Sequence, residues 1–310
     1  MMKVAIAGGT GFVGQRLVRQ LTEDGASVVL LTRNPQKGKR QFPPEAFPTV
    51  EVVPYDPRQS GPWQESISGC TGVVNLAGAP IADHRWTAEY KQEILDSRTQ
   101  TTEKLVEAIA AAPDKPQVLV NASAVGYYGT SETAVFDETS APGDDYLAQV
   151  CQAWEAAAQA VTALGTRLVI ARFGIVLGPD GGALGKMLTP FQLFAGGPIG
   201  SGQQWVSWVH RQDVVRLLTQ ALSNAEFSGV YNATAPNPVR MQTLCHVLGE
   251  VMSRPSWLPV PEFALELLLG EGAMVVLDGQ QVLPKQTLAA GFDYRFATLK
   301  PALEDILARQ

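Results

Sequence analysis

The chain has 310 residues, of which 45% are hydrophobic and 17% charged, and its formal net charge at pH 7 is −6. This length is sufficient for one large α/β domain, or for a large domain and a small one. The acidic balance argues against a nucleic-acid-binding protein, which would carry a basic face.

The cysteines and the apolar segments favour a cytoplasmic protein. Cys70, Cys151 and Cys245 lie far apart and form no CxxC pair, which predicts free thiols and no metal site. The first residues run into an apolar segment with no basic leader, and the most apolar later stretch, Phe263–Leu277, is shorter than a membrane span and contains glutamates. We therefore expect neither a membrane partner nor a nucleic-acid partner.

Short apolar runs alternate with helical patterns through the first two-thirds of the chain, which is typical of a doubly wound parallel sheet. The runs Val28–Leu31 and Val118–Val120 are apolar on both faces, as strands covered by helices on both sides are. The predicted strands are Lys3–Ala7, Ser27–Thr32, Val50–Pro54, Gly72–Leu76, Gln117–Ala122 and Arg167–Phe173. The predicted helices between them are Gly11–Glu23, Lys91–Ala111 and Ala148–Leu164.

The first predicted strand leads into a glycine-rich turn, Gly8-Gly9-Thr10-Gly11-Phe12-Val13-Gly14, which is followed by an amphipathic helix. The turn fits both GxGxxG and GxxGxxG. Glycine is needed where φ is positive, where the backbone touches a pyrophosphate and where the helix packs on the strand. The helix N-terminus offers unpaired N–H groups to phosphates. A dinucleotide site is therefore predicted, and a glycine-rich turn without a ligand is the less favoured alternative.

The end of the second strand favours NADP(H) as the cofactor. It ends in Thr32-Arg33-Asn34, and Lys37, Lys39 and Arg40 follow. An acidic residue there would bind the ribose 2′-hydroxyl and repel a 2′-phosphate, whereas a guanidinium does the reverse. The alternative is that Arg33 is a solvated loop charge.

The pattern changes after Gly174. Glycine and proline punctuate residues 178–202, and a later strand is predicted at Gly229–Ala233. Further helices are predicted at Asp213–Asn224, Met241–Ser253, Pro261–Leu269 and Leu299–Ala308. We predict an α/β fold with a Rossmann-type NADP-binding domain over residues 1–173, to which residues from about 203 to 235 contribute. Residues 174–310 are predicted to form a smaller C-terminal region that covers the substrate.

Motifs spread over the whole chain resemble the extended short-chain dehydrogenase/reductase superfamily, and more closely its atypical "epimerase family protein" group. They are the glycine turn, Asn75-Leu76-Ala77-Gly78, Arg85-Trp86, Ser97-Arg98, Ser123–Gly129, Trp154–Ala157, Gly196–Gly202, Trp208-Val209-His210, Gln281–Pro284 and Ala290-Gly291-Phe292. The resemblance implies that Asp56 lies near the adenine and that Leu76-Ala77-Gly78 walls the cofactor. It implies that Ala122 and Ser123 face the nicotinamide and that His210 lies on the substrate side. A buried, hydrogen-bonded histidine is the alternative for His210.

The Tyr-x-x-x-Lys pair of the superfamily is missing. In that pair the lysine lowers the pKa of the tyrosine and holds the nicotinamide ribose. With Glu155 as the anchor, the lysine position falls on Cys151 and the tyrosine position on Leu147, and no lysine stands between Lys115 and Lys186. Cys151 is more simply interpreted as an inert buried thiol.

Other hydroxyl groups are therefore the candidates for catalysis, namely Ser123, Tyr127 and Tyr128. The alternative is that the two tyrosines line the pocket or pack against the nicotinamide. Residues Gly196–Gly202 predict a loop over the substrate pocket. Trp205 and Trp208 after it are expected either to stack on a substrate or to pack in the pocket wall.

Two functions follow. The first is an NADP-dependent oxidoreductase, or a sugar-nucleotide epimerase-like enzyme, that acts on a small molecule with a non-standard proton donor. The second is a non-catalytic NADP(H)-binding regulator or redox sensor that acts through a protein partner. The fold does not decide between them, because the chemistry resides in the site. Members of the superfamily are often dimers, so we expect a monomer or a homodimer.

Overall fold

The computed structural model describes residues 2–309, and within them seven parallel strands form the central sheet in the order β11-β7-β5-β4-β1-β2-β3. The strands are β1 (Lys3–Ala7), β2 (Ser27–Thr32), β3 (Val50–Pro54), β4 (Gly72–Asn75), β5 (Val118–Ala124), β7 (Arg167–Phe173) and β11 (Gly229–Ala233). This order reverses between β1 and β4, the point at which doubly wound sheets bind nucleotides. The predicted α/β Rossmann-type fold is confirmed.

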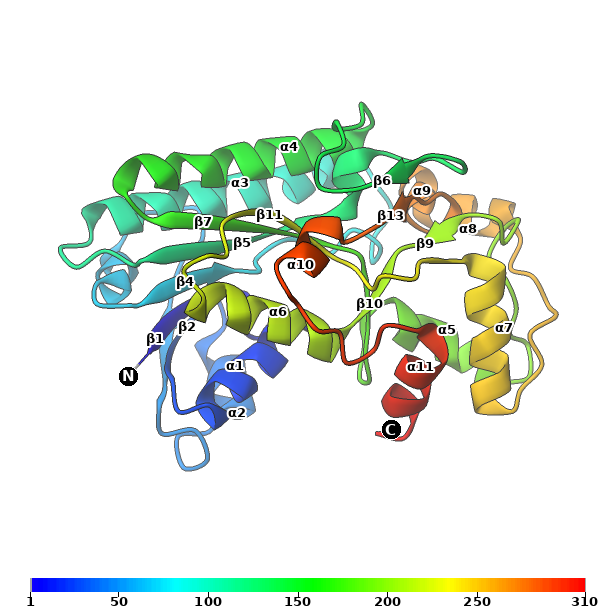
Figure 1. The fold of residues 1–310 in the computed structure, drawn as a ribbon, viewed down its shortest axis with the longest axis horizontal. Helices are drawn as coiled ribbons and strands as arrows, with labels where there is room; N and C mark the ends of the chain where they lie inside the picture. Colours follow the sequence, from blue (N-terminus) through cyan, green and yellow to red (C-terminus); the bar gives the residue numbers. More distant parts are fainter. Residues whose placement is uncertain (1, 310) are drawn as a thin grey trace.

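Helices cover both faces of the sheet (Figure 1). Helices α3 (Ala88–Ala111) and α4 (Tyr146–Gln159) lie on one face, and α1 (Gly14–Glu23) and α6 (Arg211–Ser223) lie on the other. Helix α2 (Pro35–Gln41) connects β2 to β3. The 3₁₀ helices of this part are η1 (Pro62–Ile67), η2 (Val125–Tyr128) and η3 (Ala160–Leu164).

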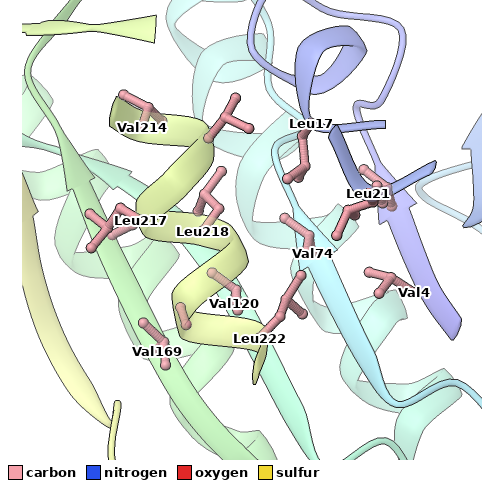
Figure 2. Close-up of a cluster of buried hydrophobic side chains, with 14 of the residues drawn as sticks. Val4, Leu17, Leu21, Val74, Val120, Val169, Val214, Leu217, Leu218 and Leu222 are labelled. Carbon is pink, nitrogen blue, oxygen red and sulfur yellow. The ribbon is translucent and has the colours of Figure 1, made fainter. Parts of the chain in front are cut away.

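The core beneath α1 and α6 is built from side chains at helical spacing that meet the branched residues of the strands. Leu17 and Leu21 of α1 and Leu218 of α6 are fully buried against Val74 and Val120 (Figure 2). Burial of a leucine or valine side chain stabilises the fold by about 1.5–3 kcal/mol. The apolar stripes of the two helices therefore hold them on the sheet and fix the position of the turn that precedes α1.

The C-terminal elements gather at one end of the sheet (Figure 1). Strand β8 (Ile175–Leu177) follows β7 directly and pairs with β10 (Trp208–His210), so this region lies at the carboxyl ends of the sheet strands. Two further pairs are β9 (Trp205–Val206) with β12 (Val239–Arg240) and β6 (Val135–Phe136) with β13 (Gln281–Val282). The helices are α5 (Gly182–Gln192), α7 (Met241–Met252), α8 (Glu262–Leu269), η4 (Gly270–Ala273), α9 (Met274–Leu277), α10 (Lys285–Ala289) and α11 (Leu299–Leu307).

The structure differs from the predicted elements in two instructive places. Helix α1 begins at Gly14 and not at Gly11, because residues 8–13 form a turn in which the Gly11 N–H donates to the Gly8 carbonyl at 3.0 Å. Helix α5 lies in the stretch that glycine and proline punctuate and was not predicted. Its buried residues Leu184, Leu188 and Phe191 have helical spacing, which the flanking glycines obscure.

Across residues 2–309, every helix is too short or too polar to cross a bilayer. The same part of the chain contains no cluster of three or more histidine, cysteine, aspartate or glutamate side chains that could hold a metal ion.

Candidate functional site

The glycine turn between β1 and α1 is fixed by close backbone contacts. Gly8 has a φ of 81°, and a Cβ atom added to it would lie 2.6 Å from the Leu76 carbonyl carbon. A Cβ on Gly14 would lie 2.3 Å from the Gly8 carbonyl oxygen, and one on Gly9 would lie 2.3 Å from Leu30 Cδ1. Side chains are thus excluded where the strand, the turn and the helix meet. No side chain caps α1; the Gln15 and Arg16 N–H groups donate to the Gly11 and Val13 carbonyls at 3.0 and 3.1 Å, so the turn itself supplies the backbone cap of the helix.

The middle of the turn faces outward. Gly11 is exposed, and Thr10, Phe12 and Val13 are half-buried. The guanidinium of Arg211 lies 4.7 Å from the centre of the Phe12 ring, and its Nη1 donates to the Phe12 carbonyl at 3.4 Å. Arg211, the first residue of α6, therefore contacts the turn at Phe12 and leaves Gly11 exposed.

Cations without partners stand beside the turn, at the carboxyl end of β2. Thr32 is buried, and its hydroxyl accepts the Asn34 N–H at 3.1 Å. Arg33 is exposed, and within residues 2–309 its side chain has neither a hydrogen-bond acceptor nor an ion-pair partner. The same holds for the side chains of Lys37, Lys39 and Arg40. This edge therefore offers positive charge to an anion such as a phosphate.

Asp56 belongs to the same edge. Burial raises the pKa of Tyr55 to about 12, while the charge of Arg33 lowers it and that of Asp56 raises it further, so both charges lie near this phenol. The Asp56 carboxylate is exposed and accepts the Arg58 N–H at 2.9 Å. Arg33 and Asp56 thus lie at the neighbouring carboxyl ends of β2 and β3.

The segment after β4 borders the turn on the other side. The Leu76 N–H donates to the Ala7 carbonyl at 2.9 Å, and the Ala77 N–H donates to Asn75 Oδ1 at 3.2 Å. Asn75 is fully buried and in turn donates to Asn121 Oδ1 at 2.8 Å. The two asparagines link β4 to β5 and hold Leu76, Ala77 and the exposed Gly78 at the carboxyl edge. Ala122 of β5 is 4% exposed.

The end of β5 is occupied by a buried polar network centred on an ion pair. Arg172 of β7 pairs with Glu155 of α4 through two bonds, Nε to Oε1 at 2.8 Å and Nη2 to Oε2 at 2.7 Å. Ser123 donates to Glu155 Oε1 at 2.6 Å. Arg172 Nη1 also donates to the Tyr128 hydroxyl at 3.0 Å, and that hydroxyl donates to Asn232 Oδ1 at 2.7 Å. We call these five residues the arginine network.

Two of the three candidate catalytic hydroxyls lie inside the arginine network. Ser123 is 2% exposed and Tyr128 is 3% exposed. Burial raises the pKa of Tyr128 to about 12, although Arg172 and Asn232 act in the opposite direction. Both hydroxyls are therefore engaged internally: Ser123 links β5 to α4, and Tyr128 links η2 to β7 and β11.

Tyr127 differs from its neighbour. Its side chain is half-buried, and within residues 2–309 its hydroxyl has no hydrogen-bond partner. The Arg172 guanidinium lies 3.3 Å from the centre of its ring, and the rings of Tyr127 and Tyr128 meet edge to face. A guanidinium over a phenol ring is a favourable contact that fixes the ring. Tyr127 thus presents a free hydroxyl next to a fixed positive charge.

The positions of the missing pair hold apolar groups. Leu147 is half-buried, and Cys151 is 4% exposed with its Sγ 3.8 Å from the Ala124 carbonyl. Burial raises the pKa of Cys151 to about 11, with Glu155 acting in the same direction. Cys151 is therefore a neutral thiol and supplies no charge.

The three residues expected at the substrate pocket lie in three different surroundings. Trp205 is half-buried, its ring lies 3.9 Å from the Arg240 guanidinium, and its Nε1 donates to the Glu132 carbonyl at 2.9 Å. Trp208 is fully buried in the core of the C-terminal region and donates to the Asn237 carbonyl at 2.9 Å. The expectation that Trp208 stacks on a substrate is therefore wrong, and its packing alternative holds, because its ring has no exposed face.

His210 ends β10, the strand that Trp208 begins, and its Nε2 lies 3.4 Å from the Asp305 carboxylate of α11. Its Nδ1 accepts the Gln212 N–H at 3.1 Å and caps α6, and its ring lies 4.0 Å from that of Phe296. Burial lowers its pKa to about 4, against the charge of Asp305, so the ring is neutral at pH 7. The structure thus gives His210 the buried, hydrogen-bonded role that was its alternative.

The loop after Gly78 is fastened from two sides by the C-terminal region. Lys186 of α5 pairs with Asp83 at 2.6 Å, and Lys91 of α3 pairs with Glu271 of η4 at 2.7 Å. The Trp86 N–H donates to the Leu269 carbonyl at 3.3 Å. The predicted loop Gly196–Gly202 packs against residues 258–260, where the Leu258 N–H donates to the Gly196 carbonyl at 3.1 Å. These contacts hold the loop after Gly78 to α5 and to residues 269–271, and the loop Gly196–Gly202 to residues 258–260.

The sequence motifs assign no role to Arg172 and Asn232. A signal was available, because Arg172 and Asn232 interrupt the apolar strands β7 and β11. A charged residue in a strand covered on both faces needs a buried partner. Glu155, used only as an anchor for the motif, is that partner.

Comparison with known proteins agrees with this geometry. Residues 4–234 match the sequence profile of the NAD dependent epimerase/dehydratase family, and residues 260–306 match a domain of unknown function, DUF1731. The Epimerase family protein SDR39U1 homolog, chloroplastic, of Arabidopsis thaliana is 50% identical over 99% of this chain and 87% of its own length. Epimerase family protein YfhF of Bacillus subtilis is 40% identical over 99% of this chain and 98% of its own length.

Solved structures show the same similarity. Human epimerase family protein SDR39U1 (isoform 2), crystallised with NADPH, superposes with a TM-score of 0.88 and 36% identity, covering 100% of both chains. UDP-glucuronic acid 4-epimerase from Bacillus cereus superposes with a TM-score of 0.80 at 17% identity, over 99% of this chain and 98% of its own. The second similarity concerns the fold alone.

Proposed function

Because this chain belongs to the NAD-dependent epimerase/dehydratase family, as its motifs predict, we propose that it binds NADP(H) and acts as an oxidoreductase on a small molecule. One observation carries the proposal: partner-free Arg33 stands at the end of β2, beside a glycine turn in which Gly8 and Gly14 have no room for a Cβ atom. The human relative at 36% identity was crystallised with NADPH.

The residues at this edge fit the cofactor. The open face of Gly8–Gly14 and the start of α1, which no side chain caps, would hold the pyrophosphate. Thr32 and Arg33 would hold the ribose 2′-phosphate, and Asp56 would lie at the adenosine. Leu76, Ala77, Gly78 and Ala122 would line the path toward the nicotinamide. When bound, the nicotinamide supplies or accepts the hydride.

Tyr127 is our candidate for the residue that exchanges a proton with the substrate. Its hydroxyl has no internal partner, and the Arg172 guanidinium is held over its ring by Glu155. A phenol in this setting would donate its proton to the carbonyl oxygen of a ketone or quinone as the hydride arrives at the carbon. Ser123 and Tyr128 would instead support Tyr127 through Glu155 and Arg172. Trp205, which is half-buried and donates to the Glu132 carbonyl, would lie on the substrate side.

A second candidate is the non-catalytic NADP(H)-binding regulator. It is favoured by Leu147 and Cys151 in place of the tyrosine and lysine, and by the burial of Ser123 and Tyr128. Such a protein would bind the cofactor and report its level to a protein partner. It would use the same dinucleotide edge and require no proton donor.

Turnover separates the two functions. Purified protein is offered NADPH with a panel of ketones, quinones and sugar nucleotides, and the oxidation of NADPH is followed. The oxidoreductase predicts turnover that Tyr127→Phe reduces by about 10²–10⁴-fold while the Kd for NADPH stays the same. Tight NADPH binding without hydride transfer to any compound would reject the oxidoreductase and favour the regulator.

A further inference from the structure

Ser97 and Arg98, in the middle of α3, form hydrogen bonds with the segment that borders the predicted cofactor site. Ser97 Oγ accepts the Ala79 N–H at 2.9 Å, and Arg98 Nη2 donates to the Ala79 carbonyl at 3.1 Å. Arg98 Nη1 also donates to the Ile94 carbonyl at 2.9 Å. Ala79 directly follows Leu76-Ala77-Gly78. Both side chains therefore reach from α3 to the carboxyl edge of the sheet.

Arg98 lies directly against Gly78. A Cβ atom on Gly78 would lie 3.1 Å from Arg98 Cζ and 3.3 Å from Nη2. The guanidinium also lies 5.2 Å from the centre of the Trp154 ring on α4. Arg98 thus occupies the space between the segment after β4 and helix α4. Cys151 of α4, which stands at the position of the superfamily's lysine, lies near this guanidinium.

The charge of Arg98 has no counter-ion. Its hydrogen bonds go to two carbonyl groups, and within residues 2–309 no carboxylate lies within ion-pair distance of it. Burial lowers the pKa of its guanidinium, and the ionisable groups that act on it are Cys151, Tyr146 and Tyr90, which are all neutral at pH 7. By contrast, the buried Arg172 is paired with Glu155 at 2.7 Å. A half-buried cation without an anion is costly to the fold and points to a charged ligand.

We infer that Arg98 binds the nicotinamide half of NADP(H), through its ribose and the adjoining phosphate, and supplies from α3 the positive charge that a lysine on α4 would supply. This inference rests on the proposed cofactor binding. It explains why Cys151 can be a buried neutral thiol in a chain that retains the rest of the dinucleotide edge. It also explains why Gly78 carries no side chain, since a methyl group there would displace the guanidinium.

Calorimetric titration with three ligands tests the inference. NADPH and NADH share the nicotinamide half, whereas adenosine 2′,5′-bisphosphate contains only the adenine half. The variants are Arg98→Met, which removes the charge, and Arg98→Lys, which keeps it. Lys104→Met is the matched control, because Lys104 is a cation of the same helix that is already paired with Glu107 at 2.7 Å.

We expect Arg98→Met to weaken NADPH and NADH by the same factor, about 10- to 100-fold, as the loss of a hydrogen bond to a charged group does. Its affinity for adenosine 2′,5′-bisphosphate should equal that of the wild type. Arg98→Lys should recover part of the NADPH affinity, and Lys104→Met should bind all three ligands normally.

Three results would overturn the inference. Normal NADPH binding by Arg98→Met would show that the guanidinium does not touch the cofactor. An equal loss for all three ligands would show that Arg98 only positions the segment around Ala79. If Arg98→Met does not fold, Gly78→Ala replaces it, and normal NADH binding by that variant would count against the inference. A wild-type protein that binds no dinucleotide would reject the proposed function itself.

Discussion

Two neighbouring parts of the carboxyl edge contrast sharply. The part formed by β1, β2 and the start of α1 leaves its polar groups open: no side chain caps α1 and Arg33 has no partner. The part formed by β5, β7 and α4 has its polar groups paired internally, in the arginine network. The first part is arranged to receive a ligand and the second to hold itself together. In the second part Ser123 and Tyr128 are bound internally, whereas the Tyr127 hydroxyl has no partner within residues 2–309.

The contrast also concerns what fixes each part. Gly8 and Gly14 are fixed by backbone contacts that exclude a Cβ atom, and a Cβ atom on Gly9 would meet the Leu30 side chain. The arginine network is fixed by side chains from different segments, with Glu155 on α4, Arg172 on β7 and Asn232 on β11. Substitutions in the first part should therefore act mainly on binding, and substitutions in the second on stability.

The largest expected effect is that of Glu155→Ala. It leaves Arg172, 3% exposed, without its counter-ion, and breaking a buried pair in this way costs about 3–5 kcal/mol. Urea unfolding followed by circular dichroism measures the loss of unfolding free energy. Glu271→Ala is the control, because the Glu271 side chain in its pair with Lys91 is 70% exposed, and the unfolding free energy should stay nearly unchanged. If Glu155→Ala were as stable as the wild type, the arginine network would not be structural.

Gly14→Ala is expected to have the next largest effect. The added methyl group would lie 2.3 Å from the Gly8 carbonyl oxygen and 2.6 Å from Gly9 Cα, so the turn must move away from α1. We expect NADPH affinity to fall by about 100-fold and stability by roughly 1–3 kcal/mol. Gly185→Ala is the control, since an added Cβ there meets no atom within 4 Å. Unchanged NADPH affinity in Gly14→Ala would separate the turn from cofactor binding.

Tyr128→Phe should cause a smaller change, a loss of unfolding free energy. Its hydroxyl donates to Asn232 and accepts from Arg172, so its removal leaves two buried partners unsatisfied, at about 1–3 kcal/mol. Tyr127→Phe is the matched variant, because the Tyr127 hydroxyl has no partner within residues 2–309 and its removal should leave stability nearly unchanged. Thermal unfolding of both variants gives the comparison. Equal losses would mean that Tyr127 shares the structural role of its neighbour.

The positions of the glycine turn and of Arg33 could be predicted from the sequence, whereas the arginine network could not, for a physical reason. The turn Gly8–Gly14 and Arg33 are local: their positions follow from one strand, one turn and the next strand. The partners of Arg172 lie 17 and 44 residues away, at Glu155 and Tyr128, and no local pattern couples them. The same limit explains Trp208, whose burial depends on packing in the C-terminal region. Helix α5 was missed because glycines at its start outweighed the spacing of its apolar residues.

The smallest expected effect is that of Arg33→Ala, and it is also the most specific. Arg33 is exposed, so water weakens its interaction with a phosphate, and we expect NADPH affinity to fall by about 5- to 10-fold. NADH lacks the 2′-phosphate, and its affinity should stay the same. Titration of both cofactors measures the ratio of the two dissociation constants.

Arg40→Ala provides the matched control for this ratio. Arg40 is an exposed cation in the last turn of α2, so the variant loses the same charge at a position beyond the end of β2. A non-specific electrostatic effect would lower NADPH affinity in both variants and would fade as salt is added, because exposed charges are screened over about 10 Å at 0.1 M ionic strength. A contact with the 2′-phosphate predicts instead that only Arg33→Ala changes the preference for NADPH over NADH. Equal losses for the two cofactors in Arg33→Ala would refute the assignment of Arg33 to the 2′-phosphate and would show instead that Arg33 acts on a part that NADPH and NADH share.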